Sequence, residues 1–542
     1  MISLYLTNED RFSHYGINHF IEKFGILVEI NKPSSSGIVI AYGGKASGDF
    51  IIALEENEIK NSICGKVSTS SELIPVCEIP RDTGSGDEVI AYFEDGTTRY
   101  PCVTRTKEGI IIGIDIFKET GYLLSGHLDM IRPSLNNTTK KELAAKPVVD
   151  FLENILFDAI LAGCYKQNIP LIQKSYWPNG KKFAVCLTHD VDEIKKTYQW
   201  ITLPLRFLAR GNFLGFKDQV SSFMQKIKGK EPYYTYDDLI NIERDLGVKS
   251  TYFILKESGK PTFSSKETWY LYGRNRSLQN PEMRALIQQL ASNGDEIAIH
   301  GSYYSYKDPV LLQEETRELE HLINTKVIGI RQHNLNLEVP TTWNFHMCAG
   351  FKYDTTLGFM DTIGFKWGTS FPFFPNTGEE PIHLLEIPLI IMDICLESSK
   401  NKEYDCLQIA DEVERYHGVL TLLWHPPIFN MLEYPDSREI YIKMNQYCKE
   451  KGAWITRARD IYEWLSVRNR NTFTSDYDPS TKTCKIVPDP ADQDHSFTLY
   501  LPPHSDCIIR SGNADILKRD GDRVYIKTQN LQNNNEVILR IT

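Results

Sequence analysis

The stretch Phe183-Ala-Val-Cys-Leu-Thr-His-Asp-Val-Asp192 decides how the rest of the chain is interpreted. Its five leading apolar residues contain no turn former and predict a buried β-strand. The carboxylates that follow must lie at the carboxyl end of that strand, because unpaired acids are costly inside a core. Side chains alternate along a strand, so Asp190 and Asp192 should face one way, and His189 and Val191 the other. Two carboxylates on one face need a cation.

A second interpretation of this stretch is a strand followed by an acidic helix start. Asp190 and Asp192 would then be caps, with Glu193 in the first turn. This alternative stays open, but it gives no role to His189 or to three later histidines that also follow apolar runs.

Length and composition limit the class of protein. A chain of 542 residues is long enough for about three domains, and 41% hydrophobic residues are typical of globular proteins. The net charge of −11 argues against a nucleic-acid or anionic membrane surface, since we find no stretch with enough Lys or Arg to outweigh it. Eleven cysteines without a CxxC pair indicate buried thiols of a reducing compartment. Without an export signal or a transmembrane run of ~20 apolar residues, we expect a cytoplasmic protein.

The two ends of the chain differ from its middle. Residues 1–170 alternate short strands with helical stretches, which predicts an N-terminal α/β domain of unknown role. Residues 471–542 hold short apolar runs between turn signals, which predicts a small C-terminal β-sandwich-like domain. In the N-terminal part, the clearest signals are three strands, Ile38–Gly44, Glu88–Phe93 and Ile110–Ile116, and one helix, Tyr15–Phe24. In the C-terminal part, they are two strands, Phe497–Leu501 and Val524–Lys527.

Residues 171–470 repeat a strand-then-helix pattern, which predicts parallel βαβ units. With about seven strands in roughly 300 residues and no glycine-rich phosphate loop, the pattern favours a deformed (β/α)7-type barrel over an open sheet. The expected strands after the first are Val248–Leu255, Glu296–His300, Val327–Arg331, Val419–His425 and Ala453–Thr456, and the expected helices include Pro281–Asn293, Asp308–Leu322, Asp411–Tyr416 and Tyr441–Lys451.

Polar residues gather where these strands end. A lone histidine at such a position is more often a hydrogen-bonded core residue, but four of the chain's 13 histidines share it. Parallel strands bring their carboxyl ends to one face, which is where barrel active sites are built. The sequence therefore predicts one site formed by Asp190, Asp192, His300, Arg331, His333 and His425.

These motifs resemble the polysaccharide deacetylases of the NodB-homology type, a family similar to carbohydrate esterase family four. The resemblance covers about Lys181 to Leu465 and is carried by four short motifs in order: Thr188-His-Asp-Val-Asp192, His300-Gly-Ser-Tyr303, Ile330-Arg-Gln-His333 and Leu422-Leu-Trp-His425-Pro. It implies a metal-dependent, seven-stranded barrel that removes N- or O-acetyl groups from sugars.

The resemblance also implies roles for single residues. Asp190 corresponds to the general base, Arg331 to the residue that orients this base, and His425 to the general acid. Asp192 and His300 correspond to metal ligands.

Two positions depart from the family pattern. Its first motif has adjacent aspartates, but here Val191 separates them; its second motif has a histidine where this chain has Tyr304. The third ligand is therefore open: His333 is the first candidate, His189 the second, and a water the third.

A carboxylate with two imidazoles suits one divalent transition metal ion, for which we favour Zn²⁺, with Mn²⁺, Co²⁺ and Fe²⁺ as alternatives. The expected activity is hydrolysis of an amide bond, which removes an N-acetyl group from a saccharide or polysaccharide precursor. Removal of an O-acetyl group stays an alternative. The aromatic residues of the late loops either stack on sugars or fill the core. We predict substrate contacts by Tyr303, Asn334, Trp367 and Trp424.

Two other functions compete with deacetylation. A carbohydrate-binding barrel that has lost its full metal site is favoured by Tyr304, and it would need no metal. The second alternative is another metal-dependent amidohydrolase. Such an enzyme would be expected to have His-x-His at the first strand, where this chain has His-Asp-Val-Asp.

Overall fold

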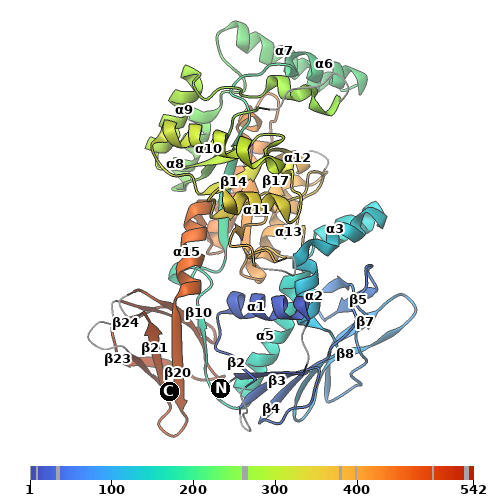
Figure 1. Ribbon diagram of the computed structural model, residues 1–542, viewed down its shortest axis with the longest axis vertical. Coiled ribbons are helices and arrows are strands. Elements are labelled where there is room, and N and C mark those ends of the chain that lie inside the picture. Colours follow the sequence, from blue (N-terminus) through green and yellow to red (C-terminus); the bar gives the residue numbers. More distant parts are fainter. Residues whose placement is uncertain are drawn as a thin grey trace.

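The computed structural model describes residues 2–7, 10–31, 37–258, 266–376, 381–396, 399–490, 493–529 and 536–542. Figure 1 shows an elongated molecule with a parallel sheet and its helices in the upper part. The first and last parts of the chain form two lobes side by side below it, and both chain ends lie there.

The middle of the chain forms a curled parallel sheet. Its strands are β11 (Ala184–Val191), β12 (Thr251–Leu255), β13 (Glu296–Gly301), β14 (Gly329–Gln332), β15 (Tyr353–Asp354), β16 (Leu385–Glu386), β17 (Ile391–Met392), β18 (Val419–Leu423) and β19 (Trp454–Thr456). Their order is β16-β15-β14-β13-β12-β11-β18-β17, and β19 pairs with the first residues of β11. The end strands β16 and β17 are two pieces of one segment, which pairs with β15 at its start and with β18 at its end. The sheet therefore closes on itself as a deformed barrel.

Helices follow these strands as expected for βαβ units. They are α6 (Gln199–Ala209), α7 (Phe213–Ile227), α8 (Tyr236–Leu246), α9 (Pro281–Ser292), α10 (Pro309–Ile323), α11 (Thr341–Cys348), α12 (Asp393–Leu396), α13 (Lys402–Arg415), α14 (Ser437–Glu450) and α15 (Ala458–Arg470). Short turns of helix lie at Pro178–Gly180, Ser305–Lys307, His333–Leu335 and Pro426–Phe429, and a 3-10 helix of eight residues lies at Lys266–Gly273. The predicted helix at Pro281 is confirmed: Asn280 caps it, and its apolar stripe is buried. Helices α13 and α14 begin nine and four residues earlier than the sequence predicted.

Strand β11 is the buried strand that the sequence predicted. All eight of its residues are buried, and the extended conformation continues to Val191. The next helix, α6, begins only at Gln199, and no side chain caps it. The capping interpretation of Asp190 and Asp192 is therefore wrong, because no helix starts where these carboxylates lie.

The first part of the chain is built on a nine-stranded sheet of order β2-β1-β3-β4-β9-β8-β7-β5-β6. Its strands are β1 (Ile2–Leu6), β2 (Glu29–Ile30), β3 (Ile38–Tyr42), β4 (Phe50–Leu54), β5 (Gly65–Ser68), β6 (Leu73–Val76), β7 (Glu88–Glu94), β8 (Arg99–Arg105) and β9 (Gly109–Ile112). The helices are α1 (Arg11–Phe24), α2 (Ile116–Tyr122), α3 (Leu128–Ile131), α4 (Asn137–Ala144) and α5 (Val148–Lys166), with short turns at Leu123–His127 and Arg132–Ser134. Lys23 of α1 is buried and bonds Asp150 and Glu153 of α5 at 2.8 and 2.9 Å, which ties the two helices together.

The last part of the chain forms two four-stranded antiparallel sheets, β10-β22-β25-β24 and β20-β21-β26-β23. Their strands are β10 (Leu171–Lys174), β20 (Thr472–Asp478), β21 (Thr483–Asp489), β22 (Ser496–Tyr500), β23 (Cys507–Ser511), β24 (Ala514–Asp520), β25 (Arg523–Thr528) and β26 (Val537–Ile541). Apolar residues from both sheets share one core. Strand β10 precedes the barrel in sequence but belongs to this pair of sheets.

Two expectations from composition can be compared with the structure. All eleven cysteines are free, and nine are buried, as the absence of a CxxC pair predicted. Among the described residues, no helix has the length and apolar character needed to cross a bilayer.

Candidate metal centre and active site

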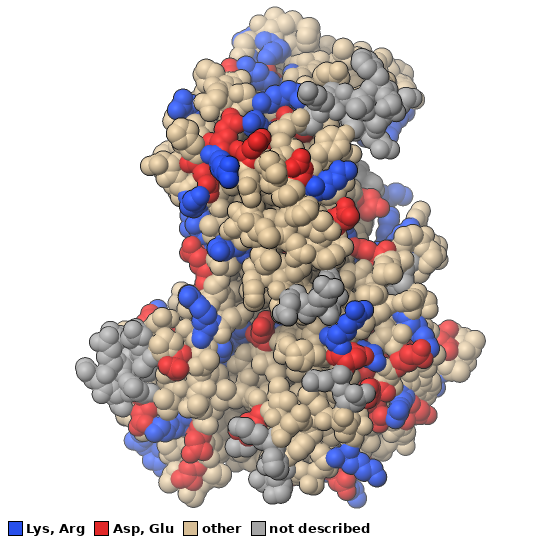
Figure 2. All heavy atoms as spheres, in the orientation of Figure 1, with Lys and Arg blue, Asp and Glu red and all other residues tan. Residues whose placement is uncertain are grey.

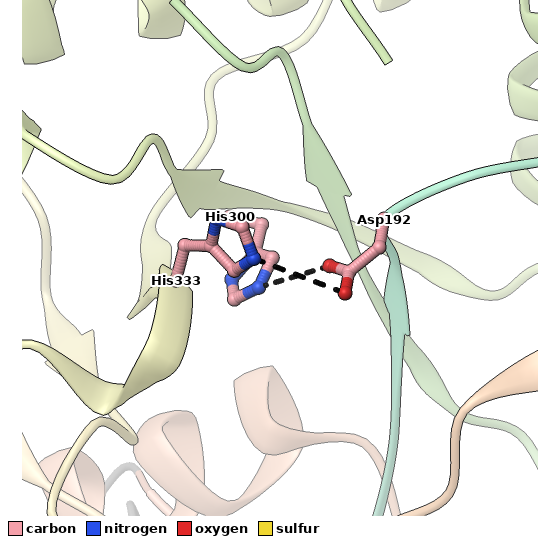
Figure 3. A group of neighbouring side chains, drawn as sticks. All are labelled: Asp192, His300 and His333. Atoms are coloured by element: carbon pink, nitrogen blue, oxygen red, sulfur yellow. Dashed lines mark ion pairs between the residues drawn. The ribbon is translucent and has the colours of Figure 1, made fainter. Parts of the chain in front are cut away.

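Three predicted residues meet at the carboxyl ends of three strands of the parallel sheet (Figure 3). Asp192 directly follows β11, His300 lies in β13, and His333 directly follows β14. One ligand atom from each lies within 4.8 Å of the others, and all three residues are buried. Nε2 of His300 lies 3.3 Å from one carboxylate oxygen of Asp192, and Nε2 of His333 lies 3.9 Å from the other.

The second nitrogen of each imidazole is held by the protein. Nδ1 of His300 lies 2.9 Å from the backbone oxygen of Arg331, and Nδ1 of His333 lies 2.9 Å from a carboxylate oxygen of Glu257. Such bonds fix the orientation of a histidine ring and direct Nε2 at the opposite side. Both Nε2 atoms then point at Asp192, as metal ligands do, so the residues present fit a divalent transition metal.

Arg274 also contacts this cluster. Its guanidinium lies 3.2 Å from Asp192 and 3.3 Å from Glu193. Burial favours the neutral form of Asp192, but Arg274 and the two imidazoles outweigh it and hold the pKa of Asp192 well below its usual range. Burial raises the pKa of Glu193 to about 7. Asp192 is thus the ionised carboxylate of the cluster, the form that binds a cation.

Asp190 lies on the same face and has a different partner. Nη1 of Arg331 donates to Asp190 over 2.8 Å, and Nε2 of His300 lies 3.5 Å from its other oxygen. Nε of Arg331 donates to the backbone oxygen of Thr355 over 3.1 Å, so the guanidinium is fixed in place. Burial opposes ionisation of Asp190, but Arg331 and His300 outweigh it and keep its pKa below its usual range.

His425 lies two residues after β18, and 18% of its side chain is accessible. Its Nδ1 lies 2.8 Å from Asp393, and this carboxylate also accepts the backbone N–H of His425 over 2.5 Å. Burial disfavours the imidazolium, but Asp393 outweighs it and raises the pKa of His425 to about 9. His425 is therefore a cation at neutral pH and can donate a proton.

Sequence reasoning missed three residues of this site: Glu257, Arg274 and Asp393. Glu257 lies two residues after β12, and Asp393 directly follows β17. The strand-end criterion that selected the other residues would have selected Glu257 as well, whereas Asp393 follows a strand of only two residues. Arg274 directly follows the 3-10 helix Lys266–Gly273, so its position carries no comparable signal.

His189 is not part of the cluster. Its imidazole lies 2.6 Å from the backbone oxygen of Trp424 and 2.9 Å from Glu243, on the opposite face of β11. The alternation along the strand predicted this direction, and it removes the second candidate for the third ligand. Tyr304 stands edge-on to Tyr303, with the ring centroids 4.9 Å apart.

Two of the four predicted substrate contacts are core residues in the structure. Trp367 is 2% exposed and donates its indole N–H to Asp129, and Trp424 is 1% exposed. Neither has an exposed ring face on which a sugar could stack, so packing explains both. Tyr303 and Asn334 are half-buried beside the metal cluster: the backbone N–H of Tyr303 donates to Glu257 over 3.3 Å, and Asn334 follows His333.

A separate cavity of ≈ 830 Å³ lies between the N-terminal nine-stranded sheet, α5, residues 415–417 and the C-terminal sheet β10-β22-β25-β24. Its lining includes Tyr92, Arg99, Asp158, His417 and Arg523, and none of the predicted site residues.

Comparison with solved structures finds similar chains over about half of this one. A protein assigned as a polysaccharide deacetylase from Mycobacterium smegmatis is 18% identical, with a TM-score of 0.35, over 54% of this chain and 94% of that one. An allantoinase is 15% identical, with a TM-score of 0.35, over 54% and 93% of the two chains. A CE4 family pseudoenzyme from Bacillus anthracis is 13% identical, with a TM-score of 0.27, over 52% and 66%. No family model matches the sequence, and no curated protein sequence matches it.

Proposed function

We propose that this chain is a metal-dependent hydrolase that removes acetyl groups, by preference N-acetyl groups, from a saccharide or polysaccharide precursor. One observation carries the proposal. A cluster of Asp192, His300 and His333 lies on the same barrel face as an ionised Asp190 and a protonated His425. Hydrolysis of an amide needs an electrophilic centre, a proton acceptor and a proton donor, and this face offers residues for all three.

Asp192, His300 and His333 would hold the metal, with Zn²⁺ favoured and Mn²⁺, Co²⁺ and Fe²⁺ as alternatives. When bound there, the metal supplies Lewis-acid polarisation of the scissile carbonyl and acidifies water. Glu257 holds the ring of His333, and the backbone of Arg331 holds that of His300.

Asp190 accepts the proton of the attacking water. Arg331 and His300 keep this carboxylate ionised despite its burial, and Arg331 fixes one of its oxygens. The other oxygen is thereby oriented toward the cluster, where it lies 3.5 Å from His300. A general base must be ionised and within reach of the proton that it takes, and Asp190 meets the first condition at neutral pH.

His425 donates a proton to the leaving amine. Its accessibility places it at the open side of the site, and its Nδ1 is held by Asp393, which leaves Nε2 for the substrate. Tyr303 and Asn334 are the remaining candidates for substrate contact, because both are partly accessible next to His333.

The proposal is tested by acetate release from a panel of N-acetylated and O-acetylated sugars, with Zn²⁺, Mn²⁺, Co²⁺ or Fe²⁺ supplied to the metal-stripped protein. We expect release from at least one N-acetyl sugar, dependent on added metal. If the metal-loaded protein binds sugars but releases acetate from none of them, the carbohydrate-binding alternative is correct.

Asp393→Asn should move the alkaline limb of the pH–rate profile to lower pH. His425 has a pKa raised to about 9 and must be protonated to act as an acid, so activity is present below that pH and is lost as pH rises through it. Asparagine removes the charge that stabilises the imidazolium, and the limb should fall by about one to three pH units. Full profiles of kcat/KM measure the shift.

Asp436→Asn is the matched control, because Asp436 is exposed and caps no helix with its side chain. An alkaline limb at the same pH in Asp393→Asn and wild type would show that His425 is not the acid.

A further inference from the structure

Helices α6 and α7 form a hairpin that extends from the barrel at the top of Figure 1. Nine of the 23 large apolar side chains that are exposed among the described residues lie on these two helices. Six of them are more than half exposed: Ile201, Leu205, Phe213, Leu214, Phe223 and Ile227. An exposed apolar surface of this extent marks an interaction site.

The polarity of α7 is the reverse of that of an ordinary surface helix, which turns its apolar stripe to the core. Gln219 and Ser222 are its buried residues, and both bond the carboxylate of Glu433. Lys196 joins the same network, with Nζ 2.6 Å from both Gln219 and Glu433. The protein thus holds α7 by its polar face and leaves the apolar face outside.

The hairpin is also basic. Residues 199–230, which are the two helices, their turn and the three residues after α7, hold six Lys or Arg residues and one acidic residue, Asp218, which gives +5 in a chain of net charge −11. Of the six, only Lys226 forms an ion pair with a described residue. Figure 2 shows mainly tan and blue surface at the top of the molecule, where Figure 1 places the hairpin. The net charge of the whole chain does not reveal this local excess of positive charge. The negative net charge therefore does not exclude an anionic surface as a partner of the hairpin.

We propose that the α6–α7 hairpin binds the surface of an anionic lipid bilayer. Exposed apolar side chains flanked by unpaired cations are the features of helices that lie in the membrane interface. Phe213 and Leu214 at the turn and the apolar stripes of both helices enter the acyl boundary, while Arg206, Arg210 and Lys217 contact anionic headgroups.

A second copy of the chain is a poorer occupant of this surface. Symmetric pairing of two hairpins would place +5 against +5, and like charges across an interface oppose binding. An anionic bilayer matches both the apolar residues and the charge.

The hairpin lies close to the site along the chain. It begins at Gln199, seven residues after Asp192, and the side chain of Gln199 bonds Glu193. Docking at the hairpin would therefore hold the site near the headgroups, where a saccharide on a lipid anchor could reach it. This consequence for the substrate rests on the proposed function; the lipid binding does not.

Co-sedimentation of the full chain with vesicles tests the proposal. We expect binding to phosphatidylcholine vesicles that contain phosphatidylglycerol, and little binding to pure phosphatidylcholine or in high salt. Combining Arg206→Gln, Arg210→Gln, Lys217→Gln and Lys228→Gln should weaken binding by about 600-fold, at roughly fivefold per cation. The triple variant Phe213→Ser, Leu214→Ser and Phe223→Ser should reduce it similarly.

The matched control is the triple variant Ile79→Ser, Met130→Ser and Val310→Ser, which replaces equally exposed apolar residues elsewhere and should bind as wild type does. Acetate release from a soluble sugar should be unchanged in both triple variants, which separates lipid binding from the proposed hydrolysis. Equal binding to neutral and anionic vesicles, binding to neither, or an equal loss in the control would overturn the proposal. The proposal would also be overturned if the wild type were a dimer and the triple variant Phe213→Ser, Leu214→Ser and Phe223→Ser were a monomer, because a second copy of the chain would then cover the hairpin.

Discussion

His300→Ala is expected to lose the bound metal and to slow acetate release by about 10³-fold or more. The histidine contributes one of three ligand atoms that lie within 4.8 Å of one another. A bound metal ion stabilises the transition state by several kcal/mol, so its loss should slow the reaction strongly. Metal content per chain, measured by elemental analysis, gives the first readout, and acetate release gives the second.

Two further variants make this test specific. Glu257→Gln removes the charge behind His333 but leaves all three ligand atoms, so metal affinity should fall by about 10- to 100-fold without being lost. His321→Gln changes an exposed histidine of α10 and should bind metal as wild type does. Equal metal content in wild type and His300→Ala would exclude this cluster as the metal site.

Much of the site was predictable because strand geometry determines it. The alternation along β11 separated Asp190 and Asp192 from His189, and the structure places His189 against Glu243 on the other face. The parallel strands brought His300 and His333 beside Asp192. These predictions depended only on side-chain direction and on where each strand ends, which are local properties of the sequence.

The missed residues depend on contacts that are distant in sequence. Asp393 was missed because the strand before it is reduced to Ile391–Met392, too short to give a periodic signal. Arg274 follows the 3-10 helix Lys266–Gly273, yet its guanidinium reaches Asp192. Trp367 was misassigned because its burial depends on packing against Gly126 and Asp129, far away in the chain. The domain boundaries near residues 170 and 470 stay a prediction.

Asp190→Asn and His425→Ala are each expected to slow acetate release by about 10² to 10⁴-fold while metal stays bound. Neither residue belongs to the ligand cluster, so the electrophilic centre should survive when proton transfer is lost. Asparagine keeps an oxygen that can accept the hydrogen bond of Arg331, which limits the strain of leaving a buried guanidinium without its partner.

The two variants should differ in their pH dependence, and that difference assigns the roles. Loss of the base should remove the acid limb, because the pKa of Asp190 lies below its usual range and its ionised form is the active one. Loss of the acid should remove the alkaline limb near pH 9, where His425 deprotonates. Circular dichroism and metal content identify any variant that merely unfolds. If both variants release acetate as fast as wild type, proton transfer at this face does not limit the reaction. Asp190 is then not the base, and His425 is not the acid.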